Sequence, residues 1–145
     1  MSITLAELGE TELLDRLARF APPGQLDDDT AMLPPDSRAL LVNTDVMVEG
    51  VHFSDATTAP ADVGWRAVVA NLSDLAASGS EQVEGITVSL VAPGTTSWWW
   101  VEQVYQGISE ALEHFGGTLL GGDCSTGNQR LLSISAFGRL GPLRL

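Results

Sequence analysis

Aspartate carboxylates can bind divalent cations, and four places in the sequence carry aspartates that could do so. These places are the run Asp27 to Asp29, Asp45, Asp74 and Asp123. Adjacent carboxylates repel one another unless cations or water screen their charge. The run at 27–29 is therefore either a solvated loop or part of a metal site, and the choice depends on the chemistry that the rest of the chain allows.

The charged residues limit the ligands that the protein can bind and the ways in which it can bind phosphate. The 145 residues include 19 acidic and 7 basic side chains, which gives a net charge of -12. Such a charge argues against binding to nucleic acid or to anionic lipid. All 7 basic residues are arginines, so the lysine of a Walker P-loop or of a protein-kinase strand is missing. If the protein handles phosphates, their counter-ions must come from solution, and Mg²⁺ held by carboxylates would supply them.

Asp74 has the most apolar sequence surroundings of these aspartates. It lies in a helix expected over residues 61–78, where Asn71 and Ser78 share its narrow face. An ionised carboxylate on a largely buried helix is costly unless it is paired or binds a metal ion. Because arginines are far fewer than acids, we predict that Asp74 binds metal, and the alternative is that it is simply solvated.

Two known acidic motifs do not match this sequence, because particular residues differ from those that the motifs require. An EF-hand loop that began at Asp27 would need glycine at its sixth position and glutamate at its twelfth, where this chain has Met32 and Arg38. A phosphatase motif of the haloacid dehalogenase type fits Asp27 and Asp29, but Ala31 stands where threonine or valine belongs. Neither motif explains the acidic run.

Apolar periodicity predicts the elements that would position these residues. The expected helices cover residues 11–20, residues 61–78 and a segment that is capped at Thr95, Thr96 or Ser97 and ends at Phe115. The expected strands cover residues 39–48, 86–91, 118–120 and 131–137. In the first strand, alternate residues share one face: Leu40, Val42, Thr44, Val46 and Val48. Because helices and strands are interleaved, we predict one α+β domain with helices packed on one face of a sheet.

The composition also bears on the compartment. Cys124 is the one cysteine in the sequence, so there is no disulfide framework and no cysteine-rich zinc site. The first residues have neither a basic region nor a long apolar region, and no apolar run approaches the roughly 18 residues that span a bilayer. We therefore expect a cytoplasmic protein.

Five motifs in series resemble the thiamine-monophosphate kinase family, and together they cover nearly the whole chain. In order they are L-A-E-L-G-E-T-E-L-L, D-D-T-A-M-L, N-T-D-V-M-V-E-G-V-H-F, G-W-R-A-V-V-A-N-L-S-D-L-A-A-S-G and L-L-G-G-D. The resemblance implies an enzyme of thiamine biosynthesis that transfers a phosphoryl group from ATP to thiamine monophosphate and forms thiamine diphosphate. It implies direct in-line transfer assisted by several Mg²⁺ ions that aspartates hold.

The same resemblance implies an architecture. The expected fold is α+β, a mixed and largely antiparallel sheet with helices packed on one face. In the family the sheets pair across a homodimer. Residues 1–145 would then be the N-terminal domain that binds ATP and Mg²⁺ and forms the dimer, and the C-terminal domain of the family is absent from them. Neither nucleic acid nor membrane is expected as a partner.

The motifs also assign roles to residues of this chain. The implied metal ligands are Asp29, Thr44, Asp45, Asp74 and Asp123. The implied ATP-binding residues are Tyr105, Gly122 and Asp123, and the implied contact to the thiamine substrate is His52. No catalytic residue is assigned. Structural alternatives remain open for three of these positions: core packing for Tyr105, an ordinary strand-end residue for His52 and a plain turn at residues 121–122.

Two departures from the family pattern leave other functions open. Asp27 replaces the glycine that usually precedes the family's Asp pair, and residues 124–126 replace its Thr-Thr-Arg, so a phosphate-contacting arginine is lost unless Arg130 serves instead. One alternative function is that of another ATP-dependent synthetase of the same superfamily. The other is that of a non-catalytic fragment for dimerisation or metal binding.

Overall fold

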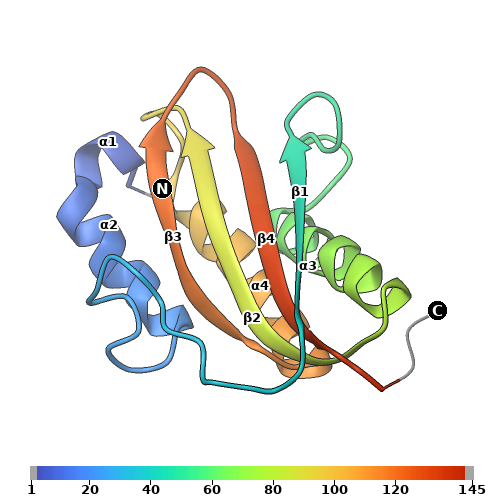
Figure 1. The fold of residues 1–145 in the computed structure, drawn as a ribbon. Coiled ribbons are helices and arrows are strands. Elements are labelled where there is room, and N and C mark those ends of the chain that lie inside the picture. Colours follow the sequence, from blue (N-terminus) through green and yellow to red (C-terminus); the bar gives the residue numbers. More distant parts are fainter. Residues whose placement is uncertain (1–2, 143–145) are drawn as a thin grey trace.

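A single sheet and two long helices make up most of the domain (Figure 1). The computed structural model describes residues 3–142. The strands are β1 (Leu40–Val48), β2 (Ser80–Ala92), β3 (Thr118–Thr126) and β4 (Leu131–Leu140). The long helices are α3 (Pro60–Ala77) and α4 (Trp98–Phe115). Before β1 come α1 (Leu5–Leu8), α2 (Glu10–Leu17) and a 3₁₀ turn at Ala18–Phe20.

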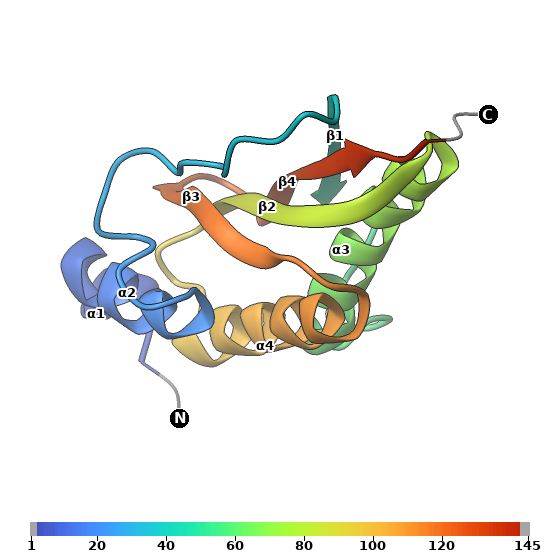
Figure 2. The same cartoon turned by 60° about the horizontal axis from the view of Figure 1, so that its bottom comes forward.

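The sheet is mixed. Its strands lie in the order β1-β4-β2-β3. β4 pairs antiparallel with both β1 and β2, whereas β2 and β3 are parallel. α3 and α4 form a layer on one side of this sheet (Figure 2). The predicted α+β architecture, a mixed and largely antiparallel sheet with helices on one face, is confirmed.

Local sequence signals explain where the two long helices begin and why they pack closely. α3 has Pro60 in its first turn, where the missing N–H is not needed. α4 is capped by Ser97, whose hydroxyl accepts a hydrogen bond of 3.1 Å from the N–H of Trp100. At the crossing, a Cβ on Gly64 would overlap the carbonyl of Val104, and a Cβ on Gly107 would overlap the carbonyl of Ala61.

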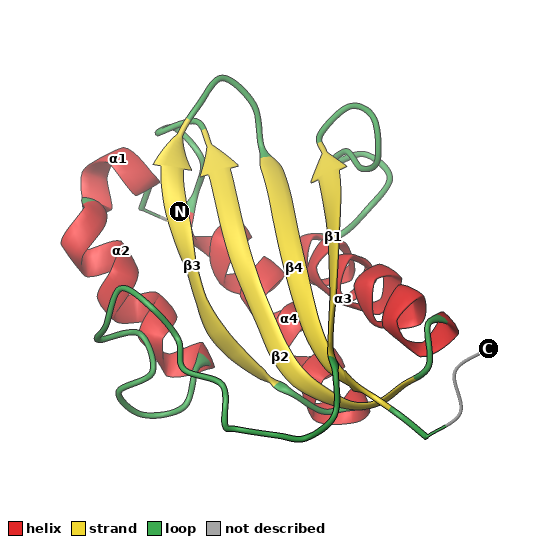
Figure 3. Ribbon diagram, viewed as in Figure 1, coloured by secondary structure: helices red, strands yellow, loops and turns green. Residues whose placement is uncertain are grey.

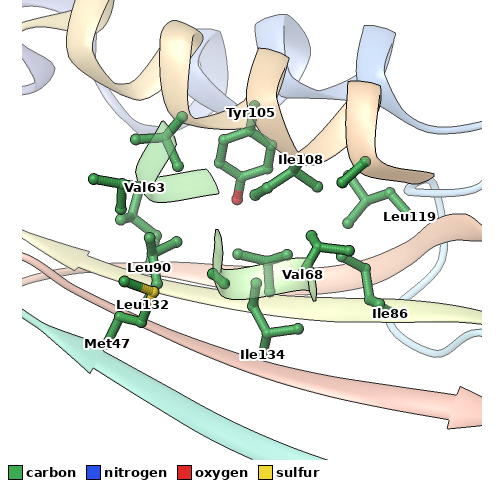
Figure 4. Packing of buried hydrophobic residues seen from close by; sticks show 14 of the residues in the cluster. Met47, Val63, Val68, Ile86, Leu90, Tyr105, Ile108, Leu119, Leu132 and Ile134 are labelled. Atoms are coloured by element: carbon green, nitrogen blue, oxygen red, sulfur yellow. The ribbon is translucent and has the colours of Figure 1, made fainter. Parts of the chain in front are cut away.

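The core lies between the helix layer and the sheet (Figure 4). Alternate residues of β2 and β4 point toward the helices, and Ile86, Leu90 and Ile134 are almost fully buried there. Val68 of α3 and Ile108 of α4 pack against them from the other side. Burying one such side chain stabilises the fold by about 1.5–3 kcal/mol. This packing fixes which face of each strand turns away from the helices.

The opposite face of the sheet carries no helix in residues 3–142 (Figure 3). The alternate residues of β1 that were expected to share one face lie on this open face, and Val42 is 58% exposed there. The segment between the 3₁₀ turn and β1 passes along one end of the sheet. It is held by hydrogen bonds from Arg139 to the carbonyl of Pro34 and from Gln25 to the carbonyl of Leu120.

The predicted start of β2 and the predicted end of β3 were wrong. β2 begins at Ser80 instead of residue 86, and β3 continues to Thr126 instead of ending at residue 120. Asp123 and the two glycines before it therefore lie inside a strand and not after one. The sequence of these extensions is rich in glycine, serine and charged residues, and pairing with neighbouring strands overrides that weak local preference. The short helix α1, with a capping box between Thr4 and Glu7, was not predicted.

No helix in the described part of the chain is long and apolar enough to cross a membrane.

Candidate functional site

The largest group of implied site residues lines a cavity beside β3, which we call the acidic pocket. Its volume is about 400 Å³, and its walls come from α2, the loop at 26–31, α4, β2 and β3. Four residues that the family motifs single out lie in this wall: Asp29, Tyr105, Gly122 and Asp123. The fold thus brings together residues that are far apart in the sequence, including all three implied ATP contacts.

The aspartates of the acidic pocket have no cationic partner among the described residues. Asp28 accepts a hydrogen bond of 2.9 Å from the N–H of Asp29, and Asp123 accepts one of 3.3 Å from the hydroxyl of Ser125. Within residues 3–142, no arginine forms an ion pair with any aspartate of this pocket. An anionic ligand such as a nucleotide would need cations from solution here, as the composition predicts.

Tyr105 belongs to the core and also reaches the acidic pocket. Its side chain is 3% exposed and packs 5.7 Å from the ring of Phe20. It lies beside Cys124 in the wall of this pocket. Burial raises the pKa of Tyr105 well above its ordinary value and raises the pKa of the Cys124 thiol to about 11. Burial thus favours the protonated forms of both groups and disfavours the reactive thiolate of Cys124.

Close packing between two strands explains why position 122 is a glycine. A Cβ at this position would overlap the carbonyl of Val88 on the neighbouring strand, whereas a Cβ on Gly121 would meet nothing within 4 Å. The alternative of a plain turn is wrong because both glycines pair within β3. Close packing of β3 on β2 therefore accounts for Gly122, in addition to any contact with a nucleotide.

A second group of implied residues lies between β1 and α3. The amide of Asn43 donates hydrogen bonds of 3.1 Å to Asn71 Oδ1 and to Asp74 Oδ2. Asn71 is fully buried and donates in turn to the carbonyl of Ala67. Asp74 itself is exposed, so burial does not require a partner for its carboxylate, and metal binding at Asp74 stays a prediction. α3 is apolar on the face that it packs, and Asp74 lies at the margin of that face.

Thr44 and Asp45 lie on opposite faces of the sheet, because successive side chains of a strand alternate. The hydroxyl of Thr44 is on the open face, 2.8 Å from the hydroxyl of Ser135. Asp45 is on the helix face and lines a cavity of about 180 Å³ together with His52. Nδ1 of His52 accepts a hydrogen bond of 2.9 Å from the N–H of Val48.

The five implied metal ligands are therefore divided among three places. In the described residues, no group of three or more His, Cys, Asp or Glu side chains is placed to hold a metal ion. The complete set does not fit a pre-formed metal centre. Asp29 and Asp123 line one cavity, and Mg²⁺ usually takes one or two carboxylates and completes its shell with phosphate oxygens and water.

Arg130 does not replace the lost phosphate-contacting arginine. It is nearly buried, forms ion pairs with Glu49 and Asp55, and its guanidinium lies 4.3 Å from the ring centroid of Trp100. Two residues near the implied site were missed from the sequence, Asn43 and Arg66. The signal for Asn43 is its strand alternation with Asp45, which places both side chains on the helix face.

Comparison with known proteins places this arrangement in a family. The sequence pattern of the AIR synthase related protein, N-terminal domain, matches residues 27–140. A thiamine-monophosphate kinase of Prochlorococcus marinus is 56% identical over 141 residues, which are 97% of this chain and 42% of that protein. The crystal structure of a thiamine monophosphate kinase from Aquifex aeolicus matches with a TM-score of 0.68 and 32% identity, over 94% of this chain and 44% of that one.

A related solved structure contains ligands. It is AaThiL complexed with AMPPCP and TMP, which matches with a TM-score of 0.67 and 33% identity over 95% of this chain and 44% of that one.

The chain belongs to the AIR synthase related family, whose N-terminal domain it contains. Within that family, its matched relatives are thiamine-monophosphate kinases, which are phosphotransferases, and the resemblance read from the five motifs is confirmed. The chain spans less than half the length of these relatives.

Proposed function

We propose that this chain is the N-terminal, ATP-binding part of an enzyme that phosphorylates thiamine monophosphate to thiamine diphosphate. The observation that carries the proposal is the likeness to AaThiL complexed with AMPPCP and TMP, over 95% of the chain. AMPPCP is an ATP analogue, so that relative binds a nucleotide and a second ligand together. The acidic pocket, with all three implied ATP contacts in its wall, supports a nucleotide site in this chain.

The proposed roles follow the geometry. Tyr105 and Gly122 contact the nucleotide in the acidic pocket, where Asp29 and Asp123 would hold Mg²⁺. When bound, Mg²⁺ supplies positive charge for the nucleotide phosphates, which no lysine or arginine of the pocket provides. His52, in the cavity between β1 and α3, contacts the thiamine substrate. Phosphoryl transfer needs positioning and charge neutralisation more than covalent help, so we propose direct in-line transfer without a phospho-enzyme.

We also propose that two copies of the domain pair through their open faces. The outer half of this face is apolar, since Leu40, Val42 and Val46 are all more than one-third exposed. An exposed apolar sheet face of this kind is usually covered by a partner.

The nucleotide proposal is tested by equilibrium binding of AMPPCP to the chain, with Mg²⁺ and with EDTA. We expect binding in Mg²⁺ that is weakened about tenfold or more by Asp123→Asn, because the substitution removes a charge that holds the cation. Asp62→Asn, an exposed aspartate on α3 outside the acidic pocket, is the matched control and is expected to bind as the native chain does. Equal binding in Mg²⁺ and EDTA, or no effect of Asp123→Asn, would contradict the proposal.

A further inference from the structure

An irregularity in the edge strand β3 lies directly before the glycines and the aspartate of the acidic pocket. Ile86 of β2 pairs with Leu119 of β3. The next residue of β2, Thr87, pairs with Gly121, so Leu120 is an extra residue that has no counterpart in β2. Such a β-bulge is frequent at sheet edges and beside functional sites. We call this feature the Leu120 bulge.

The Leu120 bulge decides which way the following side chains point. Successive side chains of a strand alternate between the two faces of the sheet, so one extra residue exchanges the faces of all that follow it. Cys124 is paired with Leu90, which is 2% exposed and belongs to the core. Asp123 is paired with Ser89, which is exposed. In a regular register Asp123 would pair with Leu90 and point toward the core, so the bulge is what places this carboxylate outside it.

Gln25 binds the Leu120 bulge. Its Nε2 donates a hydrogen bond of 3.1 Å to the carbonyl of Leu120, across 95 positions of the sequence. Gln25 directly precedes residues 26–31, which we call the acidic loop and which line the acidic pocket. α2 and the segment that follows it lie at the β3 edge of the sheet (Figure 1). The hydrogen bond therefore ties the acidic loop to the bulge that orients Asp123.

Backbone turns carry the effect of this tie into the acidic loop. The N–H of Gln25 donates to the carbonyl of Pro22 at 3.0 Å, and the N–H of Asp27 donates to the carbonyl of Gly24 at 3.2 Å. Gly24 has a φ of +76°, a conformation that glycine adopts without steric cost. Two successive turns thus surround Gln25, and Asp29 is four positions further on. A shift of the Gln25 side chain is expected to shift that carboxylate.

We propose that Gln25 is a positioning residue of the nucleotide site. Through its hydrogen bond to Leu120 it holds the acidic loop against the bulge, and it thereby sets where Asp29 lies relative to Asp123. This inference rests on the proposed function, because it concerns the nucleotide site in the acidic pocket. An amide can hold the loop in this way without adding charge to a pocket that already contains several carboxylates.

The test uses Cys124, the one cysteine of the sequence, as a reporter that needs no ligand. Cys124 and the acidic loop lie in the wall of the same pocket. Gln25→Met keeps the length of the side chain and removes its donor. Losing this hydrogen bond should raise the population of an open acidic loop, so we expect an aromatic disulfide reagent to modify Cys124 about fivefold faster or more. The midpoint of thermal unfolding should fall by about 5 °C or less.

Two control variants separate a local effect from a general loss of stability. Gln106→Met makes the same change at an exposed glutamine of α4 outside the acidic pocket, and it should behave as the native chain does. Ser97→Ala removes the cap of α4, so it should lower the unfolding midpoint without changing the modification rate of Cys124. The affinity for AMPPCP in Mg²⁺ is the second measurement. It should fall about fivefold or more in Gln25→Met and stay at the native value in both controls.

Three results would overturn the inference. The first is an unchanged modification rate of Cys124 in Gln25→Met, and the second is an equal rise of that rate in Ser97→Ala. The third is a native affinity of Gln25→Met for AMPPCP, because Gln25 would then hold the loop without serving the nucleotide site. If the native chain binds AMPPCP in Mg²⁺ and any of these results is found, the inference alone fails. If the native chain does not bind AMPPCP while Gln25→Met speeds the modification of Cys124, the proposed function fails and the placement of the acidic loop by Gln25 stands.

Discussion

Nδ2 of Asn43 lies 3.1 Å from Oδ2 of Asp74, although the two residues are 31 positions apart in the sequence. The same amide nitrogen lies 3.1 Å from Oδ1 of Asn71, which is fully buried. One strand residue therefore fixes the orientation of an exposed carboxylate and satisfies a buried amide oxygen. The contact joins β1 to α3 at the margin of the candidate site.

Replacing Asn43 by alanine should destabilise the fold. The substitution leaves Oδ1 of Asn71 buried without its donor, which costs about 1–3 kcal/mol in the free energy of unfolding. Urea denaturation followed by tryptophan fluorescence measures the change. Asn128→Ala, at an exposed turn, is the control and should stay within about 0.5 kcal/mol of the native chain. Equal stabilities of the two variants would show that the contact is not formed in solution.

The two adjacent glycines of β3 should respond differently to the same substitution. Gly122→Ala places a Cβ against the carbonyl of Val88, and relieving that overlap is expected to cost about 1–3 kcal/mol. Gly121→Ala meets no atom within 4 Å and is expected to change stability by less than about 1 kcal/mol. Thermal denaturation of both variants checks the difference. If Gly122→Ala is as stable as Gly121→Ala, the close packing of β3 on β2 is not as described.

Cys124 should react slowly with thiol reagents and should make stability fall at high pH. Burial raises the pKa of its thiol from 9.0 to about 11, so little thiolate is present at pH 8. The unfolded chain loses this proton at lower pH than the folded chain does. The free energy of unfolding should therefore decline as the pH rises from about 9 toward 11.

Modification rates with an aromatic disulfide reagent and denaturation between pH 8 and pH 11 measure the two effects. Cys124→Ala is the control, and the part of the decline that it removes belongs to the thiol. A native chain whose thiol reacts as fast as a free cysteine at pH 8 would disprove the assigned burial.

The ion pair of Arg130 with Glu49 should contribute more to stability than an exposed pair does. Glu49→Gln weakens the pairing of a nearly buried guanidinium, which we expect to cost about 2 kcal/mol because Asp55 still pairs with it. Glu12→Gln removes the exposed pair with Arg16 and should cost about 0.5 kcal/mol or less. Urea denaturation at pH 7 compares them, and equal losses would contradict the burial argument.

Acid denaturation gives a second measure of how much the Arg130–Glu49 ion pair stabilises the fold. The Arg130 guanidinium lowers the pKa of Glu49 in the folded chain. The ion pair therefore stabilises the fold at any pH above the ordinary pKa of glutamate, and this stabilisation is lost as the pH falls through the lowered pKa of Glu49. Glu49→Gln should therefore lose less stability than the native chain between pH 5 and acid unfolding. An identical acid slope in both proteins would rule out this contribution.

The proposed pairing of open faces predicts that a charge on β1 blocks self-association. Val42→Lys places an ammonium group in the centre of the exposed apolar surface, and burying it between two sheets is unfavourable. Sedimentation at several protein concentrations should give a dimer for the native chain and a monomer for the variant. Leu14→Lys, an equally apolar exposed position on α2, should remain dimeric. A native chain that stays monomeric at all concentrations would refute the pairing.

Much of the fold follows from the sequence by itself. The apolar stripes of α3 and α4 repeat at helical spacing, and Ser97 and Pro60 mark where these helices begin. The interleaving of helices and strands is enough to predict an α+β sheet with helices on one face. The absence of lysine, read from composition, already excluded a Walker P-loop and led to the expectation that cations from solution would neutralise bound phosphates.

Only the tertiary structure decided which side chains meet. Strand periodicity places Thr44 and Asp45 on opposite faces, but it does not say which face the helices cover, because that depends on how the whole sheet packs. The exposure of Asp74 and its amide partner Asn43 depend on a contact over 31 positions. Among residues 3–142, Arg66 forms no ion pair for the same reason, since such a pair depends on which carboxylates the packed elements bring near the guanidinium.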